Sequence, residues 1–408
     1  MLPLRRAIIP QYIVARVART YVLLLLVVWG FCPHDANGDQ RPKKPEPLIT
    51  AVLPAEQAWQ VPLSSPPSAG AAIDDRRVYI PLDEEHVVAI DRETGAMVWS
   101  VDIESEWPPL VHDGVLYIAA SDELHALDAA TGNRLWRVLL PRGAMAPMAM
   151  TPAGVIVLSP PDSVLAFKTS DGSLLWGRPL GGRSGRVSLA VNATDIYVSL
   201  VDRLVRIAPT DGSIVWERTL PGEIASTAVA RDRVFAGSTS NEIYALEPDR
   251  GRLVWRFPFG GDVIGIAATN DLVFVVSLDN VVRALKRSNG NQIWKRPLTT
   301  RPVAAPQVFD GVIAVAAADS VATFNSKTGV PIGTFDATTL LRGQPLVDAI
   351  PKPFAVSILA ITRDGRAIGL RPVEMLFREK AIEPFAALPG HPVQKETSPL
   401  QKEASPLP

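Results

Sequence analysis

The sequence predicts an all-β protein, an eight-bladed β-propeller whose blades are four-stranded antiparallel sheets. Three observations predict it. A glycine and a tryptophan recur together about every 40 residues, each repeat contains short apolar runs separated by turn residues, and the chain begins and ends with incomplete repeats. A steady period of this length is typical of proteins in which each repeat forms one structural unit, and antiparallel units arranged in a ring form a propeller.

The recurring pair is a glycine followed, four residues later, by a tryptophan. Seven glycines are separated by 37 to 40 residues, six of them have this tryptophan, and a further tryptophan stands ahead of the first glycine. Glycine at a fixed turn position indicates a backbone with positive φ, which other residues adopt only at a cost. The predicted structural repeat residues are Trp59, Gly95, Trp99, Gly132, Trp136, Gly172, Trp176, Gly212, Trp216, Gly251, Trp255, Gly290, Trp294 and Gly329.

One repeat, 115–140, shows the nature of the unit. An apolar run at 115–120 is followed by a polar turn, an alternating run at 124–128, a second turn and a last run at 135–139, and a shorter apolar run precedes them at 108–112. Short runs rich in Val, Ile, Leu and aromatic residues, bounded by Gly, Asp, Asn and Ser, predict strands joined by tight turns. A helical repeat would show spacings of three and four residues over longer runs. The unit is therefore predicted to be a four-stranded antiparallel blade.

Counting the units predicts how the ring closes. Eight outer strands are expected, seven at the recurring tryptophans and one at the tryptophan-free copy 333–335, together with eight inner strand pairs. The first outer strand, 58–63, has no inner strands before it, and the last inner strands, 355–370, have no outer strand after them. We expect the N-terminal strand to complete the C-terminal blade, because closure removes exposed sheet edges. Seven blades are the alternative if the last copy is irregular.

Two segments, 89–99 and 126–136, have the sequences AIDRETGAMVW and ALDAATGNRLW. Both resemble the AxDxxTGxxxW docking motif of the pyrroloquinoline-quinone (PQQ) type propeller repeats, and the later copies keep the Gly and Trp while the Asp and Thr drift. The resemblance covers residues 57–372. It implies a propeller in which each tryptophan packs between neighbouring blades. The family contains PQQ dehydrogenases, non-enzymatic scaffolds and sensor domains, and the layout is most similar to the BamB lipoproteins of outer-membrane assembly.

The N-terminal segment predicts export. Residues 1–32 contain four arginines and no acidic residue, and an apolar run extends from Tyr21 to Phe31. Eleven apolar residues suit a signal-peptide core and fall short of the roughly 20 that a spanning helix needs. Counted from Ala7, the run has spanning length, so residues 1–32 are predicted to be a signal peptide or a retained membrane anchor. Either one places the propeller outside the cytoplasm, in a bacterial periplasm or at the outer membrane.

Two further regions outside the repeats bear on attachment. The single cysteine, Cys32, directly follows the apolar run, a placement that resembles a lipoprotein acylation site, although Phe31 before it is not a small residue. The sequence is compatible with a lipidated Cys32 and with an unmodified Cys32. The proline-rich residues 33–56 predict a linker that holds the propeller off the membrane. Residues 373–408, rich in Pro, Ser, Lys and Glu, predict a largely disordered tail.

The chain carries no catalytic or metal-binding motif. A formal net charge of −1 argues against a nucleic-acid partner, and five histidines are scattered without metal-ligand spacing. His125 alternates with apolar residues and is interpreted as a core or channel-lining residue. PQQ dehydrogenases of the family it resembles use a disulfide between adjacent cysteines, Ca²⁺ and an Asp base. One cysteine outside the repeats cannot form that disulfide, so we predict a protein that is not an enzyme and holds no cofactor.

Two functions are compatible with the sequence. The first is a scaffold that binds protein partners in the cell envelope, including the barrel-assembly machinery; the second is a ligand-sensing or PQQ-binding propeller that uses its central channel. The fold alone does not separate them. The connections at 180–187 and 220–224 differ between repeats, and variable loops on a constant frame are where recognition usually resides. Arg183 and Arg186 are the candidate interaction residues, with solvated surface arginines as the alternative interpretation.

Overall fold

The structure is a computed structural model that describes residues 55–372, apart from positions 85, 141, 183–184, 310, 338–339, 342–345 and 348–357. The expected export segment 1–32 with Cys32, residues 33–54 of the expected linker and the expected tail 373–408 all lie outside the described residues. No helix in the described part of the chain is long and apolar enough to cross a membrane.

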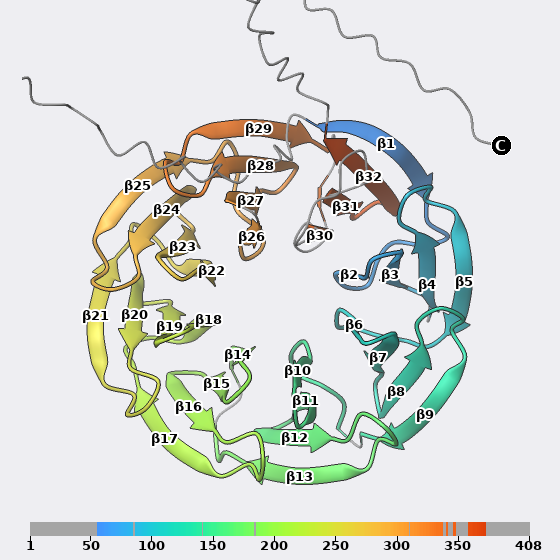
Figure 1. Cartoon of the computed structure of the whole chain (residues 1–408), viewed down its shortest axis with the longest axis horizontal. Coiled ribbons are helices and arrows are strands. Elements are labelled where there is room, and N and C mark those ends of the chain that lie inside the picture. The colour runs from blue at the N-terminus through green and yellow to red at the C-terminus, as the bar shows by residue number, and fades with distance from the viewer. Residues whose placement is uncertain are drawn as a thin grey trace, which may run out of the picture. The chain divides into compact units, whose positions relative to one another are not determined.

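The described strands form eight four-stranded antiparallel sheets arranged in a ring (Figure 1). We number these sheets blades 1 to 8, and in blades 1 to 7 the strands follow one another from the centre of the ring outward. Blades 1 to 4 consist of β2 (Ala72–Ile73), β3 (Arg77–Leu82), β4 (His86–Asp91) and β5 (Met97–Asp102); β6 (Leu110–His112), β7 (Val115–Ala119), β8 (Glu123–Asp128) and β9 (Arg134–Leu139); β10 (Ala149–Thr151), β11 (Gly154–Ser159), β12 (Ser163–Phe167) and β13 (Leu174–Pro179); and β14 (Val187–Val191), β15 (Ile196–Leu200), β16 (Arg203–Ile207) and β17 (Ile214–Thr219).

The other four blades repeat this arrangement, the last of them with strands from both ends of the described chain. Blades 5 to 8 consist of β18 (Ile224–Ala230), β19 (Arg233–Ser238), β20 (Glu242–Leu246) and β21 (Leu253–Pro258); β22 (Val263–Ala268), β23 (Leu272–Ser277), β24 (Val281–Lys286) and β25 (Gln292–Pro297); β26 (Gln307–Phe309), β27 (Val312–Ala316), β28 (Ser320–Asn325) and β29 (Pro331–Asp336); and β30 (Leu346–Val347), β31 (Ile358–Thr362), β32 (Arg366–Pro372) and β1 (Ala55–Pro62).

Blade 8 closes the ring as the sequence predicted. Strand β1 pairs antiparallel with β32, from Ala55 opposite Pro372 to Pro62 opposite Arg366, and the two strands lie side by side at the perimeter in Figure 1. The backbone N–H of Leu63 continues the pairing by donating to the carbonyl of Gly365 at 2.8 Å. The all-β class, the eight blades and closure by the N-terminal strand are confirmed, and the seven-bladed alternative is wrong because the tryptophan-free copy forms a regular outer strand, β29.

The hydrophobic core lies between the blades. All five residues of β15 are buried, whereas the outer strands are mostly exposed, with a half-buried or buried residue at the tryptophan position. Each cluster of buried residues combines two neighbouring blades; one, for example, joins Tyr197 and Leu204 of blade 4 to Ile224 and Val234 of blade 5. A strand that is covered on both faces is an apolar run without alternation. This explains why the second strand of each blade is the most apolar segment of its repeat.

Each recurring tryptophan lies against the next blade along the chain. Trp216 packs on Gly251, whose φ is +60°, and a Cβ at that glycine would lie 2.8 Å from the indole ring. The indole N–H donates to the carbonyl of Pro248 at 2.6 Å, and the ring of Tyr197 packs beside the indole at a tilt, with centroids 6.0 Å apart. The same N–H contact joins the other tryptophans to the following blade, as pairs Trp59–Arg92, Trp99–Ala129, Trp136–Thr169, Trp176–Pro209, Trp255–Arg287 and Trp294–Ser326.

A β-bulge orients these tryptophans. In blade 4, Ile207 pairs with Ile214 and Arg206 pairs with Trp216, so Val215 is the extra residue of the outer strand. The bulge directs the indole toward the next blade and leaves Val215 47% exposed. Equivalent irregularities occur in the outer strand of every blade, so the exposed apolar residues before the tryptophans follow from the docking geometry.

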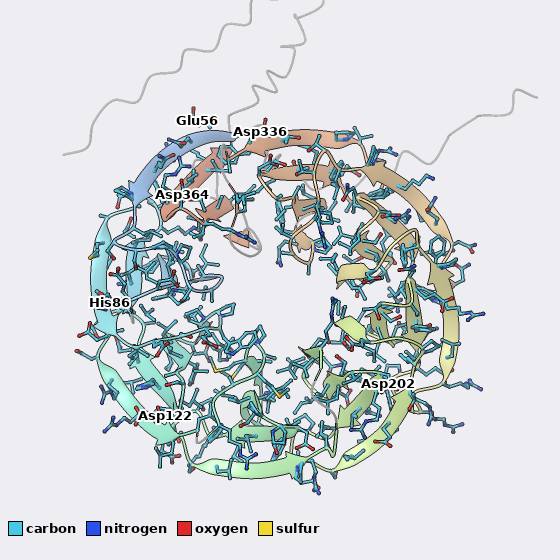
Figure 2. All side chains as sticks on the ribbon, turned by 180° about the vertical axis from the view of Figure 1, so that it is seen from behind. Glu56, His86, Asp122, Asp202, Asp336 and Asp364 are labelled. Carbon is cyan, nitrogen blue, oxygen red and sulfur yellow. The ribbon has the colours of Figure 1, made fainter. Side chains whose placement is uncertain are left out.

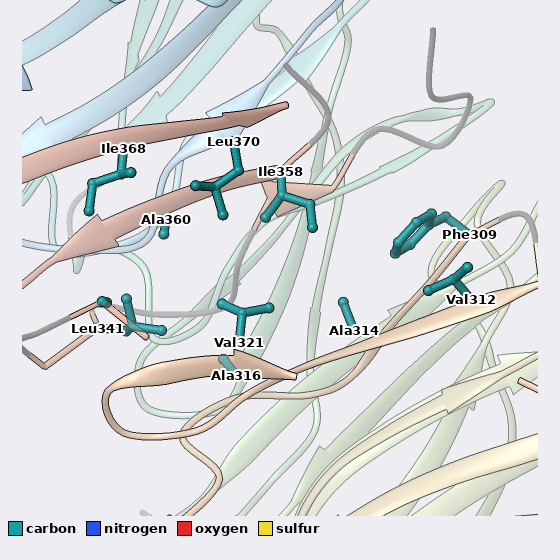
Figure 3. Packing of buried hydrophobic residues seen from close by; sticks show 11 residues of the cluster. Phe309, Val312, Ala314, Ala316, Val321, Leu341, Ile358, Ala360, Ile368 and Leu370 are labelled. Carbon is teal, nitrogen blue, oxygen red and sulfur yellow. The ribbon is translucent and has the colours of Figure 1, made fainter. Parts of the chain in front are cut away.

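The boundary between blades 7 and 8 is built differently. Gly333 stands opposite Thr323, at the register position that tryptophan occupies in the other outer strands. Figure 3 shows the cluster that fills this boundary, in which aliphatic residues of blade 7 such as Val312 and Val321 face residues of blade 8 such as Ile358 and Leu370. Blade 8 has no turn between its third and outer strands, because β32 and β1 belong to opposite ends of the described chain. A tryptophan in β29 would therefore have no turn to dock on.

Candidate interaction surface

The ring has two faces that differ in what they carry. Because the strands of a blade are antiparallel, the turns between second and third strands share one face with the connections from one blade to the next; we call this the loop face. The other face, the turn face, carries the turns between first and second strands and between third and fourth strands. Connections between blades on the loop face range from four residues at 220–223 to nine at 298–306, so their lengths differ around the ring.

The connection that contains both candidate arginines is fixed at its start by the neighbouring turns. The N–H of Leu180 donates to the carbonyl of Asp162 at 2.9 Å, and the N–H of Gly182 donates to its carboxylate at 3.0 Å. From blade 4, Arg203 donates to the carbonyl of Leu180 at 3.1 Å and to that of Gly181. These contacts hold the entrance of the 180–186 connection in one conformation.

Arg186 lies at the end of the same connection and meets the next one. Its Nε is 3.8 Å from Oε2 of Glu223, and the two side chains are 51% and 46% exposed. An exposed ion pair at this distance contributes little to stability, so its charges remain accessible to a partner. Arg183 lies outside the described residues. The structure therefore brings Arg186 together with Glu223, an acidic residue that the sequence analysis did not single out.

Val201 joins the two connections through its backbone. Its N–H donates to the carbonyl of Arg186 at 3.0 Å, and its own carbonyl accepts from the N–H of Ile224 at 2.6 Å. Val201 has φ of +55°, a conformation that is strained for a β-branched residue. Strain of this kind persists where the surrounding structure imposes it, and it concentrates at functional positions. No residue-type pattern marks Val201, so the sequence could not have pointed to it.

The other end of the 220–223 connection is tied to blades 4 and 5. The N–H of Leu220 donates to the carbonyl of Asp202 at 2.8 Å; Asp202 lies in the turn after β15 and is labelled in Figure 2. The N–H of Glu223 donates to the side chain of Thr239 at 3.0 Å, and the N–H of Thr239 donates back to the carbonyl of Glu223 at 2.9 Å. The Arg186–Glu223 pair therefore stands on a backbone fixed from both sides.

Away from this surface, one buried histidine contacts a charged side chain. His125 is 5% exposed, and its Nε2 lies 3.2 Å from Glu123, which also contacts Arg137 at 3.2 Å. Burial lowers the pKa of His125, so its imidazole is neutral at pH 7. Within the described ranges, His, Cys, Asp and Glu side chains form no group of three that could hold a metal ion.

One small cavity on the loop face involves a tryptophan outside the repeat. Glu104, Glu106, Trp107 and Arg142 are among the residues around a cavity of about 190 Å³. The indole N–H of Trp107 donates to the carbonyl of Ala144 at 3.0 Å, which fixes the ring. Typical small-molecule sites enclose roughly 300–1,000 Å³, so this cavity suits a small group better than a cofactor of several rings. Trp107 was not predicted as a site residue, because it stands outside the glycine–tryptophan period.

Solved structures similar to this chain share its propeller fold. BamB from Moraxella catarrhalis is 20% identical, with a TM-score of 0.62 over 78% of this chain and 99% of that chain. The computationally designed Ika8 protein is 16% identical, with a TM-score of 0.68 over 78% and 100%. The quinohemoprotein alcohol dehydrogenase ADHIIG from Pseudomonas putida HK5 is 12% identical, with a TM-score of 0.62 over 78% and 76%. At these identities the likeness extends to the fold alone.

Sequence comparison identifies the family. No curated protein matches the chain significantly. The family model described as outer membrane protein assembly factor BamB matches residues 46–202, 162–258, 201–332 and 240–397, overlapping segments that include every blade. This match agrees with the repeat motif and with the closed eight-bladed ring. The chain therefore belongs to the BamB family of PQQ-type propeller proteins.

Proposed function

We propose that this protein is an exported, membrane-attached scaffold without enzymatic activity, and that it binds protein partners of outer-membrane assembly through its loop face. The observation that carries the proposal is the site where blades 4 and 5 meet. There two connections are linked through the strained backbone of Val201, and an exposed pair of opposite charges, Arg186 and Glu223, stands on them. The BamB family membership supports the same role.

The geometry suits recognition of another protein. Because the connections are held by hydrogen bonds to neighbouring turns, a partner loses little binding free energy in ordering them. Exposed charges at an interface mainly set orientation and the rate of association. An arginine and a glutamate side by side select a partner that presents the complementary arrangement. A large apolar cavity is not required for this mode of binding.

A pull-down from detergent-solubilised envelope tests the proposed surface. The full-length protein should capture barrel-assembly proteins, and the double variant Arg183→Glu/Arg186→Glu should lose most of that capture. Arg76→Glu is the matched control, since Arg76 is an exposed arginine on the turn face. Equal capture by the double variant and the wild type would show that this surface is not the binding site.

Attachment to the membrane is part of the proposal and has its own test. We propose that residues 1–32 direct export, that residues 33–56 hold the ring away from the bilayer and that residues 373–408 do not take part in the fold. Fractionation should find the propeller outside the cytoplasm. Cys32→Ala should release the protein into the soluble fraction if acylation anchors it, whereas retention after this change would assign anchoring to an uncleaved N-terminal helix.

Ligand binding is the second candidate function. The cavity at Trp107 favours a ligand of small size, and the propeller fold shared with a quinohemoprotein alcohol dehydrogenase makes PQQ the cofactor to test. Titrating the full chain with PQQ and Ca²⁺ while following tryptophan fluorescence separates the two functions. If the protein is a scaffold, the fluorescence should show no saturable change. Saturable quenching at micromolar PQQ together with dye-linked alcohol oxidation would show instead that the protein is a PQQ-dependent enzyme.

A further inference from the structure

A crevice on the turn face, between blades 4 and 5, is rich in arginine. Its volume is about 590 Å³, and its walls come from the turns after β14, β18 and β20. Four carboxylates belong to it: Asp195, Asp232, Glu247 and Asp249. Five arginines line it and a sixth contacts one of those carboxylates: Arg206, Arg231, Arg233, Arg250, Arg252 and Arg287.

The deepest arginine has a structural role. Nε and Nη2 of Arg206 each lie 2.7 Å from Oδ1 of Asp195, and the two side chains are 17% and 7% exposed. Arg206 also donates to the carbonyl of Pro248 at 3.1 Å, which joins blade 4 to the turn after β20. Breaking such a buried pair is strongly destabilising. This pair is therefore the floor of the crevice and is not free to bind a ligand.

Two more carboxylates are engaged by arginines on the walls. Glu247 accepts two hydrogen bonds from Arg252, at 3.1 and 2.7 Å, and these bonds hold the pKa of Glu247 below its usual value. Asp232 lies 3.0 Å from Arg233 and also contacts Arg287. One carboxylate shared between two guanidinium groups neutralises only one of their charges. The walls therefore keep a surplus of positive charge.

Arg231 and Arg250 supply the rest of the surplus. Both are exposed, and neither side chain makes a hydrogen bond or ion pair with another described residue. They come from two turns of the same blade, the first between β18 and β19 and the second between β20 and β21. The lining residues, five arginines and four carboxylates, carry a formal charge of +1, and Arg287, which contacts Asp232, brings the group to +2, although the whole chain carries −1.

A crevice at a similar position in the ring shows that this charge does not follow from the fold. Between blades 1 and 2, a turn-face crevice of about 480 Å³ carries Arg76 and Arg77 with Asp74, Asp75 and Asp113. Its formal charge is −1, and Asp74 is occupied by hydrogen bonds from the backbone N–H groups of both arginines at 2.7 Å. Two crevices on one repeated frame thus differ in sign.

We propose that the crevice between blades 4 and 5 binds a phosphate group, with Arg231 and Arg250 as its direct ligands. Guanidinium forks match the geometry of phosphate oxygens, and a dianion would neutralise the surplus of two charges. The phosphate can belong to a soluble phosphorylated compound or to a phospholipid headgroup, which share this chemistry. The proposal does not depend on the scaffold function, because it concerns the opposite face of the ring.

The test compares the full-length protein with the double variant Arg231→Ala/Arg250→Ala. Both side chains are exposed and outside the ion pairs of the crevice, so the variant should keep the melting temperature of the wild type. Calorimetry with inorganic phosphate at low salt should show saturable binding, and the double variant should bind at least about tenfold more weakly. Added NaCl should weaken binding to the wild type through screening. Each single variant should show a smaller loss.

A second arm identifies the source of the phosphate, and Arg76→Ala in the crevice between blades 1 and 2 is the matched control. Co-sedimentation with phosphatidylglycerol vesicles but not phosphatidylcholine vesicles, lost in the double variant, supports a headgroup. Phosphate binding without vesicle binding supports a soluble compound. The proposal is overturned if neither probe binds, if the double variant binds phosphate as well as the wild type does, or if Arg76→Ala is equally impaired.

Discussion

Seven boundaries between blades are sealed by a tryptophan, and the boundary between blades 7 and 8 is not. In the seven, an indole such as Trp216 fills the space that only a glycine leaves, and its N–H is satisfied by a carbonyl of the same turn. At the eighth, Gly333 takes the place of tryptophan, and Phe335, with the apolar cluster of Figure 3, fills the boundary.

The difference shows that a tryptophan at this position depends on the turn of the next blade as much as on its own strand. The turn between third and outer strands supplies both the glycine and the carbonyl, and blade 8 lacks this turn because β1 and β32 come from opposite ends of the described chain. An indole there would leave its N–H without the partner that buried polar groups require. The closing boundary depends instead on apolar packing and on the β1–β32 ladder.

The largest effect is expected from removing the strand that completes blade 8. Deleting residues 55–62 exposes the edge of β32 and uncovers the cluster beneath Trp59 and Val61. The deletion should lower the free energy of unfolding by more than the roughly 3–5 kcal/mol of a single large-to-small core change. Thermal unfolding followed by circular dichroism measures it, with deletion of residues 391–408 as the control. Equal melting temperatures for the two truncations would contradict closure by this strand in solution.

The next largest effect concerns a sealed boundary. Trp216→Ala should destabilise the protein by about 3–5 kcal/mol, because it removes a buried ring and leaves a cavity against Gly251. Urea unfolding measures the change. Trp107→Ala is the control, since Trp107 lies outside the repeat and does not seal a boundary between blades by docking on a turn glycine. A Trp216→Ala protein as stable as Trp107→Ala would show that the indole does not hold the blades together.

Replacing a turn glycine should destabilise the protein in two ways, through backbone strain and through contact with the tryptophan, and two variants separate them. Gly114 and Gly132 both have φ of +75°, but a Cβ at Gly132 would lie 2.9 Å from Trp99, whereas one at Gly114 meets nothing within 4 Å. Gly114→Ala should therefore cost about 1 kcal/mol from backbone conformation alone, and Gly132→Ala a further 1–3 kcal/mol or so from displacing the indole. If the two variants unfold at the same urea concentration, close approach of the tryptophan is not what requires glycine.

A smaller effect is expected at the eighth boundary. Phe335 is only half-buried and is one of several apolar residues packed there. Phe335→Ala should cost about 1–2 kcal/mol, less than Trp216→Ala, when both are compared by urea unfolding. A cost equal to that of the tryptophan variant would mean that the closing boundary depends on a single ring after all.

The smallest effect is a pH dependence of stability that arises in the turns between third and outer strands, on which the tryptophans pack. Hydrogen bonds from Thr131, by its hydroxyl and its N–H at 2.8 Å each, hold the pKa of Asp128 below its ordinary value of 3.8. The carboxylate therefore stabilises the turn above that pH, and this contribution disappears as the pH falls through the lowered pKa. Asp128→Asn should differ from wild type by no more than about 0.5 kcal/mol at pH 7, and the difference should shrink below pH 4. Asn325, already an amide in the equivalent turn, supplies the comparison that does not titrate.

The sequence predicted part of the candidate site and missed its most constrained residue. Variable connections at 180–187 and 220–224 were visible because they interrupt a regular repeat, and Arg186 lies in the first of them. Glu223 and Val201 were not singled out, because their positions depend on hydrogen bonds between connections that are far apart in the chain. A backbone angle such as that of Val201 is imposed by its surroundings and leaves no trace in residue type.

By itself, the sequence determined the strands, the number of blades and the closure of the ring. These follow from local patterns, namely apolar runs, turn glycines and a steady period, which the chain repeats often enough to count. Only the tertiary structure decided which apolar residues fill the boundary without a tryptophan and where charges gather. Arg231 and Arg250, for example, meet at one crevice because two turns of blade 5 end on the same face. Contacts of this kind depend on distances in space, which spacing along the chain does not encode.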